Sequence, residues 1–400
     1  MSLIIGARGI GDWSVPDERP KNYHEVLFKL VPDLAPLFNL TSKLGSEETT
    51  DMEYAVFNEG LPVTALQVSG AVTNVATTIN LTGATPAKAV RAGDIIRNRR
   101  TDELLRVASD PVTPFTSITV DTRGGWGGGA AAMNDLDYLD IMSPAGIEGD
   151  VAPTAVSDTP TVDWNYCQDI EEACELSDWA RDTKIRPAEE KAWAREKRRA
   201  SERFKLKWEK ALYYGKKVST TVGGKQSYLT GGLNYWVTSN NFDDTSTGTS
   251  IDRVLDIFAQ MRSYNQGSDT KWGFAGAGAI TRLANLVRKS TVSNFTMSDP
   301  LDKRGTWGLK VMNFEGPTMA LQLIQSGVLS MMDTNRVFIV DPKYIKTARR
   351  NGSIGPVHYD DDIKKDNGYK GIKGRWRAVM GLMLGQQSVH GKWLVGDPIP

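Results

Sequence analysis

Few residues in this chain have types and spacings that could support catalysis. The three histidines, His24, His358 and His390, are scattered along the sequence. No serine lies in the GxSxG pattern that marks many hydrolase nucleophiles. A triad would therefore depend on folding alone, and we expect no catalytic residues.

Two short segments could bind small ligands. Gly276-Ala277-Gly278 resembles the start of a phosphate loop, but Thr281 stands where the dinucleotide pattern needs its third glycine. The run from His358 to Asp362 offers oxygen ligands for a divalent cation, yet its spacing differs from that of an EF-hand loop. We interpret the first as a tight turn and the second as an acidic loop, so we expect no cofactor and no metal.

The same acidic loop could instead meet basic residues of a neighbouring copy. We predict that Asp360, Asp361 and Asp362 make contacts of this kind between subunits. A separate candidate surface is the basic stretch from Arg195 to Lys210, which glutamates interrupt. A salt-bridged face between copies, with Arg195, Arg199 and Arg203 as contacts, is favoured over a surface that follows nucleic-acid phosphates. Both can hold in one assembly, because a weak attraction to DNA needs no specific site.

Composition limits the class of protein. The chain has 400 residues, 40% of them apolar, and its 48 basic side chains balance 48 acidic ones. This is typical of a folded protein with two or three domains, and it argues against a surface that binds nucleic acid everywhere. No run of about 18 apolar residues occurs, so we expect no membrane partner.

One segment alternates for longer than an ordinary strand. From Thr161 to Ser177 apolar side chains such as Trp164, Tyr166 and Ile170 recur at every second position, with partial breaks at Gln168 and Glu172. Strict alternation predicts a strand with one buried face, and seventeen residues would extend roughly 55 Å.

A long helix is predicted next, over residues 186–214. Pro187 suits its first turn and Gly215 its end, and its length would be roughly 44 Å. A small domain is about 30 Å across, so one chain cannot easily cover both elements. We therefore expect neighbouring copies to cover them, with Trp164 and Tyr166 among the contacts.

The remaining segments differ in composition. Residues 1–50 are broken by Gly and Pro but carry apolar anchors, which predicts an arm lying across another surface. Residues 88–148 contain short strands and a Gly-rich run, typical of a small inserted β module. From about residue 250, strand and helix patterns alternate as in an α/β domain.

This order of parts resembles the major capsid protein of tailed bacteriophages, the Hong Kong 97-type fold, in a branch with a β module inserted in its extended loop. Nearly the whole chain takes part in the likeness. The local patterns that carry it are Pro36-Leu37-Phe38, Ala92-Gly93-Asp94-Ile95-Ile96-Arg97, Thr161-Val162-Asp163-Trp164-Asn165-Tyr166, Glu209-Lys210-Ala211-Leu212-Tyr213-Tyr214-Gly215-Lys216 and Thr230-Gly231-Gly232-Leu233.

The resemblance implies an α+β fold with five parts. These are an N-terminal arm, an extended β loop with a small barrel-like insert, a peripheral domain with its spine helix, an α/β axial domain and a terminal β segment. Their expected bounds are 1–50 for the arm, 51–180 for the loop with 88–148 as the insert, 181–254 for the peripheral domain with 186–214 as the spine helix, 255–345 for the axial domain and 346–400 for the terminal segment.

The resemblance also implies a function. The chain would self-assemble as hexamers and pentamers into the icosahedral head of a virion that encloses double-stranded DNA, in the cytoplasm of a host bacterium. A portal protein and possible scaffold or decoration proteins would be further partners. Many relatives begin with a long charged scaffolding segment that this sequence lacks, so we expect a separate scaffold or none.

Three alternatives stay open on the sequence alone. Tail tube and decoration proteins also use long loops between subunits, although they usually lack a long basic helix followed by an α/β domain. A bacterial nanocompartment shell shares the fold but would need a cargo pocket. A hydrolase would need a concave site with convergent polar groups.

Overall fold

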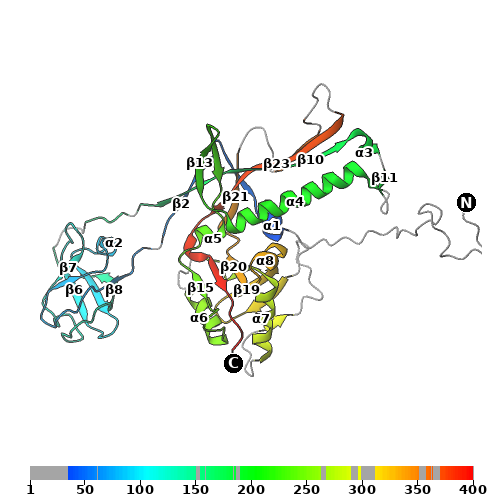
Figure 1. The fold of residues 1–400 in the computed structure, drawn as a ribbon. Coiled ribbons are helices and arrows are strands. Elements are labelled where there is room, and N and C mark those ends of the chain that lie inside the picture. Colours follow the sequence, from blue (N-terminus) through cyan, green and yellow to red (C-terminus); the bar gives the residue numbers. More distant parts are fainter. Residues whose placement is uncertain are drawn as a thin grey trace, which may run out of the picture. The chain divides into compact units, whose positions relative to one another are not determined.

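The computed structural model describes residues 35–399 except for the gaps at 61, 150–153, 158, 183, 186–189, 263–266, 290–295, 299–310, 351–356, 362 and 364–369. The described chain forms two compact units (Figure 1). The first, which we call the body, is formed by the described parts of Met1–Phe57 and Val162–Pro400. The second, which we call the insert, is Asn58–Thr161.

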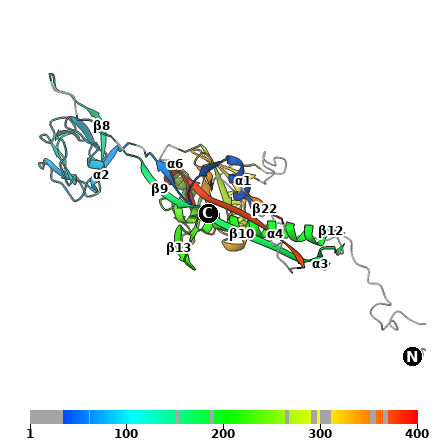
Figure 2. The ribbon, with the colours of Figure 1, turned by 90° about the horizontal axis from the view of Figure 1, so that it is seen from above.

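The body contains a five-stranded sheet in the order β1-β21-β23-β10, with β22 also paired to β23. Its longest pairing is antiparallel, between β10 and β23, and runs from Gln168 opposite Met380 to Ser177 opposite Gly371. Helix α4 lies along these two strands in both views (Figures 1 and 2). The bounds are β1 Ser46–Thr49, β10 Gln168–Ser177, α4 Ala192–Tyr214, β21 Ile345–Arg350, β22 His358–Asp360 and β23 Gly371–Leu384.

A second sheet of the body has seven strands in the order β15-β24-β20-β16-β19-β18-β17. On α6, Val254, Ile257, Phe258 and Met261 repeat at helical spacing and are buried against this sheet's core. The bounds are β15 Asn241–Asp243, α6 Ile251–Arg262, β16 Thr270–Ala275, α7 Ala277–Lys289, β17 Thr296–Ser298, β18 Val311–Glu315, β19 Ala320–Gln325, α8 Gly327–Met332, β20 Arg336–Val340, a 3-10 turn Gln387–Val389 and β24 Gly391–Leu394.

Shorter elements complete the body. Strand β2 pairs with β9, and β13 and β14 form a hairpin. The bounds are β2 Glu53–Asn58, β9 Thr161–Tyr166, α3 Asp178–Asp182, β11 Lys184–Ile185, β12 Glu190–Lys191, β13 Val218–Val222, β14 Lys225–Leu229 and α5 Leu233–Trp236.

The insert is a single six-stranded sheet in the order β3-β8-β5-β6-β7-β4. Its two end strands meet through a bridge between Val68 and Leu81, so the sheet closes on itself around an apolar core. The predicted module 88–148 is therefore too short, because β3 and β4 precede it and belong to the same sheet. The bounds are β3 Ala65–Gln67, β4 Thr78–Asn80, α2 Ala84–Ala87, β5 Asp94–Asn98, β6 Leu104–Ser109, β7 Ser117–Val120 and β8 Tyr138–Pro144.

The prediction of one unbroken strand over 161–177 is wrong. The chain breaks at Cys167, whose N–H donates to the carbonyl oxygen of Met52 and whose side chain is buried. Before the break β9 pairs with β2, and after it β10 pairs with β23. The buried side also changes, since Asn165 is buried before the break and Ile170 after it. Alternation in sequence therefore did not reveal the change of partner.

Two further boundaries differ from prediction. Helix α4 begins at Ala192 instead of residue 186, because Glu190–Lys191 forms a short strand with Lys184–Ile185. Pro187 lies outside the described residues. The part of the predicted arm from residue 35 to residue 50 belongs to the body, where helix α1 (Pro36–Leu44) buries Leu37, Phe38 and Leu40 in the subunit's own core. The arm residues 1–34 lie outside the described residues.

A buried histidine, His390, makes the stability of the body depend on pH. His390 is fully buried, and its Nδ1 accepts the N–H of Asp341 at 3.2 Å while Nε2 lies 3.0 Å from the carbonyl oxygen of Gly385. These contacts fix a neutral ring with its proton on Nε2. Burial lowers the pKa of His390 to about 4, although the hydrogen bond to Gly385 opposes this change.

We expect His390→Gln to remove part of the acid sensitivity of the body. An unfolded histidine titrates near 6.5, so the unfolded chain takes up a proton first as the pH falls, and stability is lost between about pH 6.5 and 4. Between pH 7 and pH 5, protonation of His390 lowers the free energy of unfolding of the wild type by about 2 kcal/mol. The variant has no such loss. Urea unfolding at both pH values measures the difference. His358→Gln, at an exposed histidine, is the control; equal pH dependence in wild type and His390→Gln would contradict the prediction.

Candidate assembly surfaces

Three of the motifs that carry the family resemblance, those around Asn165, Gly215 and Gly232, meet at one point in the body. Asn165 is buried, and its amide donates to the carbonyl oxygens of Leu382 at 2.8 Å and Gly231 at 3.2 Å. Its Oδ1 accepts the N–H of Gly231 at 2.8 Å. Gly232 in turn donates its N–H to Gly215 at the end of α4. This set of contacts, which we call the junction, holds β9, the end of α4 and β23 together.

The ring of Tyr166 lies beside the junction. Its centroid is 5.2 Å from that of Tyr228 on β14, and the Lys217 ammonium lies 5.5 Å from it. Trp164, on the same strand, is 47% exposed. Of the two predicted contacts on this strand, the structure therefore gives Tyr166 partners within the subunit and leaves about half of Trp164 in solvent.

The basic side chains of α4 divide into paired and exposed groups. Arg203 Nε lies 2.7 Å from Glu172 Oε1 on β10, and Lys207 pairs with the same carboxylate. Partial burial would raise the pKa of Glu172, but the hydrogen bonds from Lys207 and Arg203 outweigh burial and hold that pKa below its ordinary value. Arg199 is exposed, whereas Arg195 is half-buried. The predicted contact residues Arg195, Arg199 and Arg203 thus lie on one helix but differ in burial and in ion pairing.

The predicted acidic contacts are bonded within the subunit. Asp360 lies 2.7 Å from Arg375 Nε and 2.8 Å from His358 Nε2. The Arg375 hydrogen bond holds the pKa of Asp360 below its ordinary value. Asp361 accepts the Tyr359 hydroxyl at 3.1 Å, and Asp362 lies outside the described residues. A role of these carboxylates between subunits stays a prediction.

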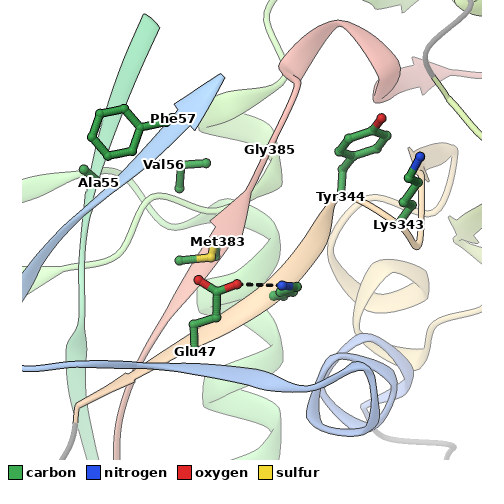
Figure 3. A pocket seen from close by; sticks show the side chains of 9 residues that line it. Glu47, Ala55, Val56, Phe57, Lys343, Tyr344, Met383 and Gly385 are labelled. Atoms are coloured by element: carbon green, nitrogen blue, oxygen red, sulfur yellow. Dashed lines mark hydrogen bonds and ion pairs between the residues drawn. The ribbon is translucent and has the colours of Figure 1, made fainter. Parts of the chain in front are cut away.

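A groove that the sequence did not reveal lies on the body beside β2. It has a volume of about 320 Å³, and Phe57, Tyr344 and Met383 supply its apolar surface (Figure 3). Glu47 and Lys346 form an ion pair of 2.6 Å at its edge. Phe57 is 71% exposed, so the groove has an open aromatic rim. The lining residues are Glu47, Ala55, Val56, Phe57, Lys343, Tyr344, Lys346, Met383 and Gly385.

The hairpin β13–β14 is a second exposed surface. It stands away from the sheet that contains β21 and β23 in both views (Figures 1 and 2). Val222 at its tip is 66% exposed, and Val218 and Leu229 are 41% and 42% exposed. Two paired strands with apolar side chains in solvent form a surface that another molecule can cover.

Within the described ranges, no group of three or more His, Cys, Asp or Glu side chains could hold a metal ion. No helix in the part of the chain that the structure describes is long and apolar enough to cross a membrane.

Glu209 is one of the glutamates within the basic stretch of α4, and the sequence pattern does not reveal its role. Glu209 is fully buried and accepts the N–H groups of Leu37 at 3.1 Å and Phe38 at 2.7 Å. One signal was available. Helix α1 begins after Ala35, which has no capping side chain, so the N–H groups of its first turn need an acceptor from elsewhere.

Long elements with large apolar side chains left in solvent define a structural subunit whose surfaces suit association with other copies. The chain belongs to the SU10 major capsid protein family, whose model matches residues 9–394. It is a capsid shell protein with a mixed α+β fold, as predicted, and its family is structural and not enzymatic. No curated protein matches the sequence.

Solved structures with similar chains include phage particles and an encapsulin. A chain of Mycobacterium phage Adephagia is 8% identical with a TM-score of 0.47, over 99% of each chain. A chain of Microbacterium phage Oxtober96 is 9% identical with a TM-score of 0.46, over 95% of this chain and 96% of that one. The SrpI encapsulin of Synechococcus elongatus PCC 7942 is 10% identical with a TM-score of 0.42, over 61% of this chain and 78% of that one. The family assignment rests on the family model.

Proposed function

We propose that this capsid protein assembles as hexamers and pentamers into a closed icosahedral shell around the double-stranded DNA of a tailed phage. Assembly takes place in the host cytoplasm, with a portal protein and separate scaffold or decoration proteins as partners. Residues 1–34 and the insert reach neighbouring copies in this proposal. The domain roles inferred from the resemblance, peripheral and axial, belong to it as well.

The observation that carries this proposal is the exposure of large apolar side chains on the body. Phe57 at the groove, Trp164 on β9 and Val222 at the hairpin tip are 71%, 47% and 66% exposed. Burying such a side chain contributes about 1.5–3 kcal/mol. Repeated over many subunits, contacts of this size close a shell, while each single contact stays reversible because association has its own cost.

The exposed cations of α4 support weak contact with packaged DNA. Arg199, Lys205 and Lys210 are exposed, whereas Arg203 and Lys207 already share Glu172. The overall charge of the chain is zero, so any attraction is local and falls steeply with salt. Such binding would be independent of DNA sequence.

We expect Phe57→Ser to leave the isolated subunit folded but to weaken its assembly. The side chain is mostly in solvent, so its loss should change the free energy of unfolding by no more than about 0.5 kcal/mol. If a second copy covers it, losing about 2 kcal/mol per contact raises the protein concentration needed for assembly roughly 30-fold. Light scattering and negative-stain images of the purified chain measure this concentration and the particle shape.

Glu53→Ser is the matched control, because Glu53 lies exposed on the same strand. The control should assemble like the wild type. Tubes in place of closed shells, or a wild-type chain that stays monomeric with its partners present, would contradict the proposed function. If Phe57→Ser assembles like the wild type, the groove is not a contact between subunits.

A further inference from the structure

Glu209 is a buried carboxylate that bonds to the first turn of a helix far away in sequence. Its two oxygens accept the N–H groups of Leu37 and Phe38 at 3.1 and 2.7 Å, across 172 and 171 positions of the chain. The first N–H groups of a helix have no partner within it and carry partial positive charge, so a carboxylate there satisfies both donors and the helix dipole. Nothing within α1 does this, since Ala35 has no capping side chain.

The attachment lies at α1, the helix that directly follows residues 1–34 in the chain. Helix α1 packs on α4 and β21, and Ala35, Leu37 and Leu40 belong to the main core of the body. The contact with Glu209 therefore fixes where α1, which follows residues 1–34 in the chain, lies on the body.

No cation among the described residues balances the charge of Glu209. The titratable group beside it is Tyr213 on its own helix, whose hydroxyl is buried near Ser326, the cap of α8. Beyond it, the Tyr214 hydroxyl donates to Asp333 at 3.5 Å, and Arg336 pairs with that aspartate at 3.0 Å. From α1 only backbone N–H groups face the carboxylate.

We propose that Glu209 caps helix α1 from across the core and is the positioning residue that fixes, through α1, where residues 1–34 join the body for assembly. The role of Glu209 in assembly rests on the proposed function, because it assumes that residues 1–34 contact neighbouring copies. The capping of α1 by Glu209 is independent of that function.

The sign of the pH effect follows from burial. Burial raises the pKa of Glu209 to about 7, although the N–H groups of Phe38 and Leu37 and the Tyr213 hydroxyl lower it. When α1 moves away and water reaches the carboxylate, the pKa returns toward its ordinary value of 4.5. Glu209 thus keeps its proton to a higher pH while α1 is packed on it than after α1 has moved away. The packing of α1 on the body therefore weakens as the pH rises. Between pH 5.5 and pH 8 the opening equilibrium of α1 should increase about 30-fold.

Hydrogen–deuterium exchange of the amides of α1 in the full chain tests the cap, after correction for the intrinsic exchange rate at each pH. We expect the wild type to show the 30-fold increase. Glu209→Gln, neutral at every pH, should show none. Glu209→Ala leaves both N–H groups without an acceptor and should open α1 roughly tenfold to a hundredfold more often at pH 6. Glu202→Gln, a charge loss elsewhere on α4, should behave like the wild type.

Assembly of the same proteins tests the positioning role. Looser α1 together with loss of closed shells in Glu209→Ala supports the proposal. Exchange that is the same in wild type, Glu209→Gln and Glu209→Ala overturns the cap. Looser α1 with normal shells overturns the positioning role while the shell function stands. A wild type that forms no shells under any condition contradicts the proposed function instead, and leaves the exchange result on Glu209 intact.

Discussion

Gly232→Ala is expected to destabilise the body by about 3 kcal/mol or more, because the junction has no room for one methyl group. A Cβ at this position would lie 2.6 Å from the carbonyl oxygens of both Ala211 and Leu212, and 2.9 Å from the backbone nitrogen of Gly215. All three are backbone atoms at the end of α4, so no side chain can rotate away. The helix end or the loop must shift, and the bond from Gly232 N–H to Gly215 would be strained with it.

The matched control is Gly223→Ala in the β13–β14 hairpin. Gly223 has a φ of 58°, which side chains disfavour, but nothing lies within 4 Å of its Cβ position. Its cost should be about 1 kcal/mol, from backbone conformation alone. Gly232 has an ordinary φ of −91°, so conformation alone would predict the opposite ranking. Urea unfolding of the unassembled chain decides the order; a smaller loss for Gly232→Ala than for Gly223→Ala would show that the junction is loosely packed.

The junction also shows what the sequence could predict. The motifs around Asn165, Gly215 and Gly232 were recognised in chain order, and this order was sufficient to predict the class of protein. It did not show that the three motifs touch. Asn165 bonds to Gly231 and Leu382 across 66 and 217 positions, and local patterns do not contain information about partners at such distances.

The errors in the predicted elements have related causes. Alternation placed Trp164 on a buried face, but in β9 the buried side chain is Asn165, whose amide satisfies backbone groups that the core would otherwise leave without partners. Helical spacing treated Glu209 as part of a solvated face, because a charged residue is rarely buried unless it is paired. In both cases a polar side chain is buried because it bonds to a backbone group far away in sequence. Hydrophobic patterning reflects the average preference of a residue type for burial and does not identify such a partner.

The assembly surfaces were only partly predictable for a different reason. The basic helix and the long strands were visible as patterns, yet α4, β10 and β23 pack on one another and so provide much of the cover that was assigned to other copies. The groove beside β2 takes residues from β1, β2, β21 and β23, which only the fold brings together. Length of an element is thus a weaker sign of assembly than an exposed side chain such as Phe57.

The insert contains a buried ion pair, and we expect its disruption to cause the second large loss of stability. Arg123 and Glu103 have side chains that are 2% and 0% exposed, and their closest atoms are 2.6 Å apart. Arg123 also donates to the carbonyl oxygens of Thr73, Ala76 and Ala131. These contacts join the Gly-rich segment to the start of β6 and to the loop before β4, so the pair holds three parts of the insert together.

We expect Glu103→Leu to destabilise the insert by about 3–5 kcal/mol, because it leaves the Arg123 guanidinium buried without a counter-charge. The double variant Glu103→Leu with Arg123→Met should recover part of this loss, since no buried charge is left. Recovery should be incomplete, because three backbone carbonyls then lack their donor at about 1 kcal/mol each. Hydrogen exchange of the β5 and β6 amides reports the opening of the insert separately from the body.

A pair that is more open to water supplies the comparison for the effect of burial. Arg99 and Asp140 lie 2.7 Å apart on the same sheet, with side chains 54% and 22% exposed. Asp140→Ala should cost no more than about 1 kcal/mol, since water compensates the arginine that is left. A double variant less stable than Glu103→Leu alone would show that the carbonyl contacts of Arg123 outweigh its charge. The pair would then stabilise the insert mainly through the hydrogen bonds of one arginine to three backbone segments.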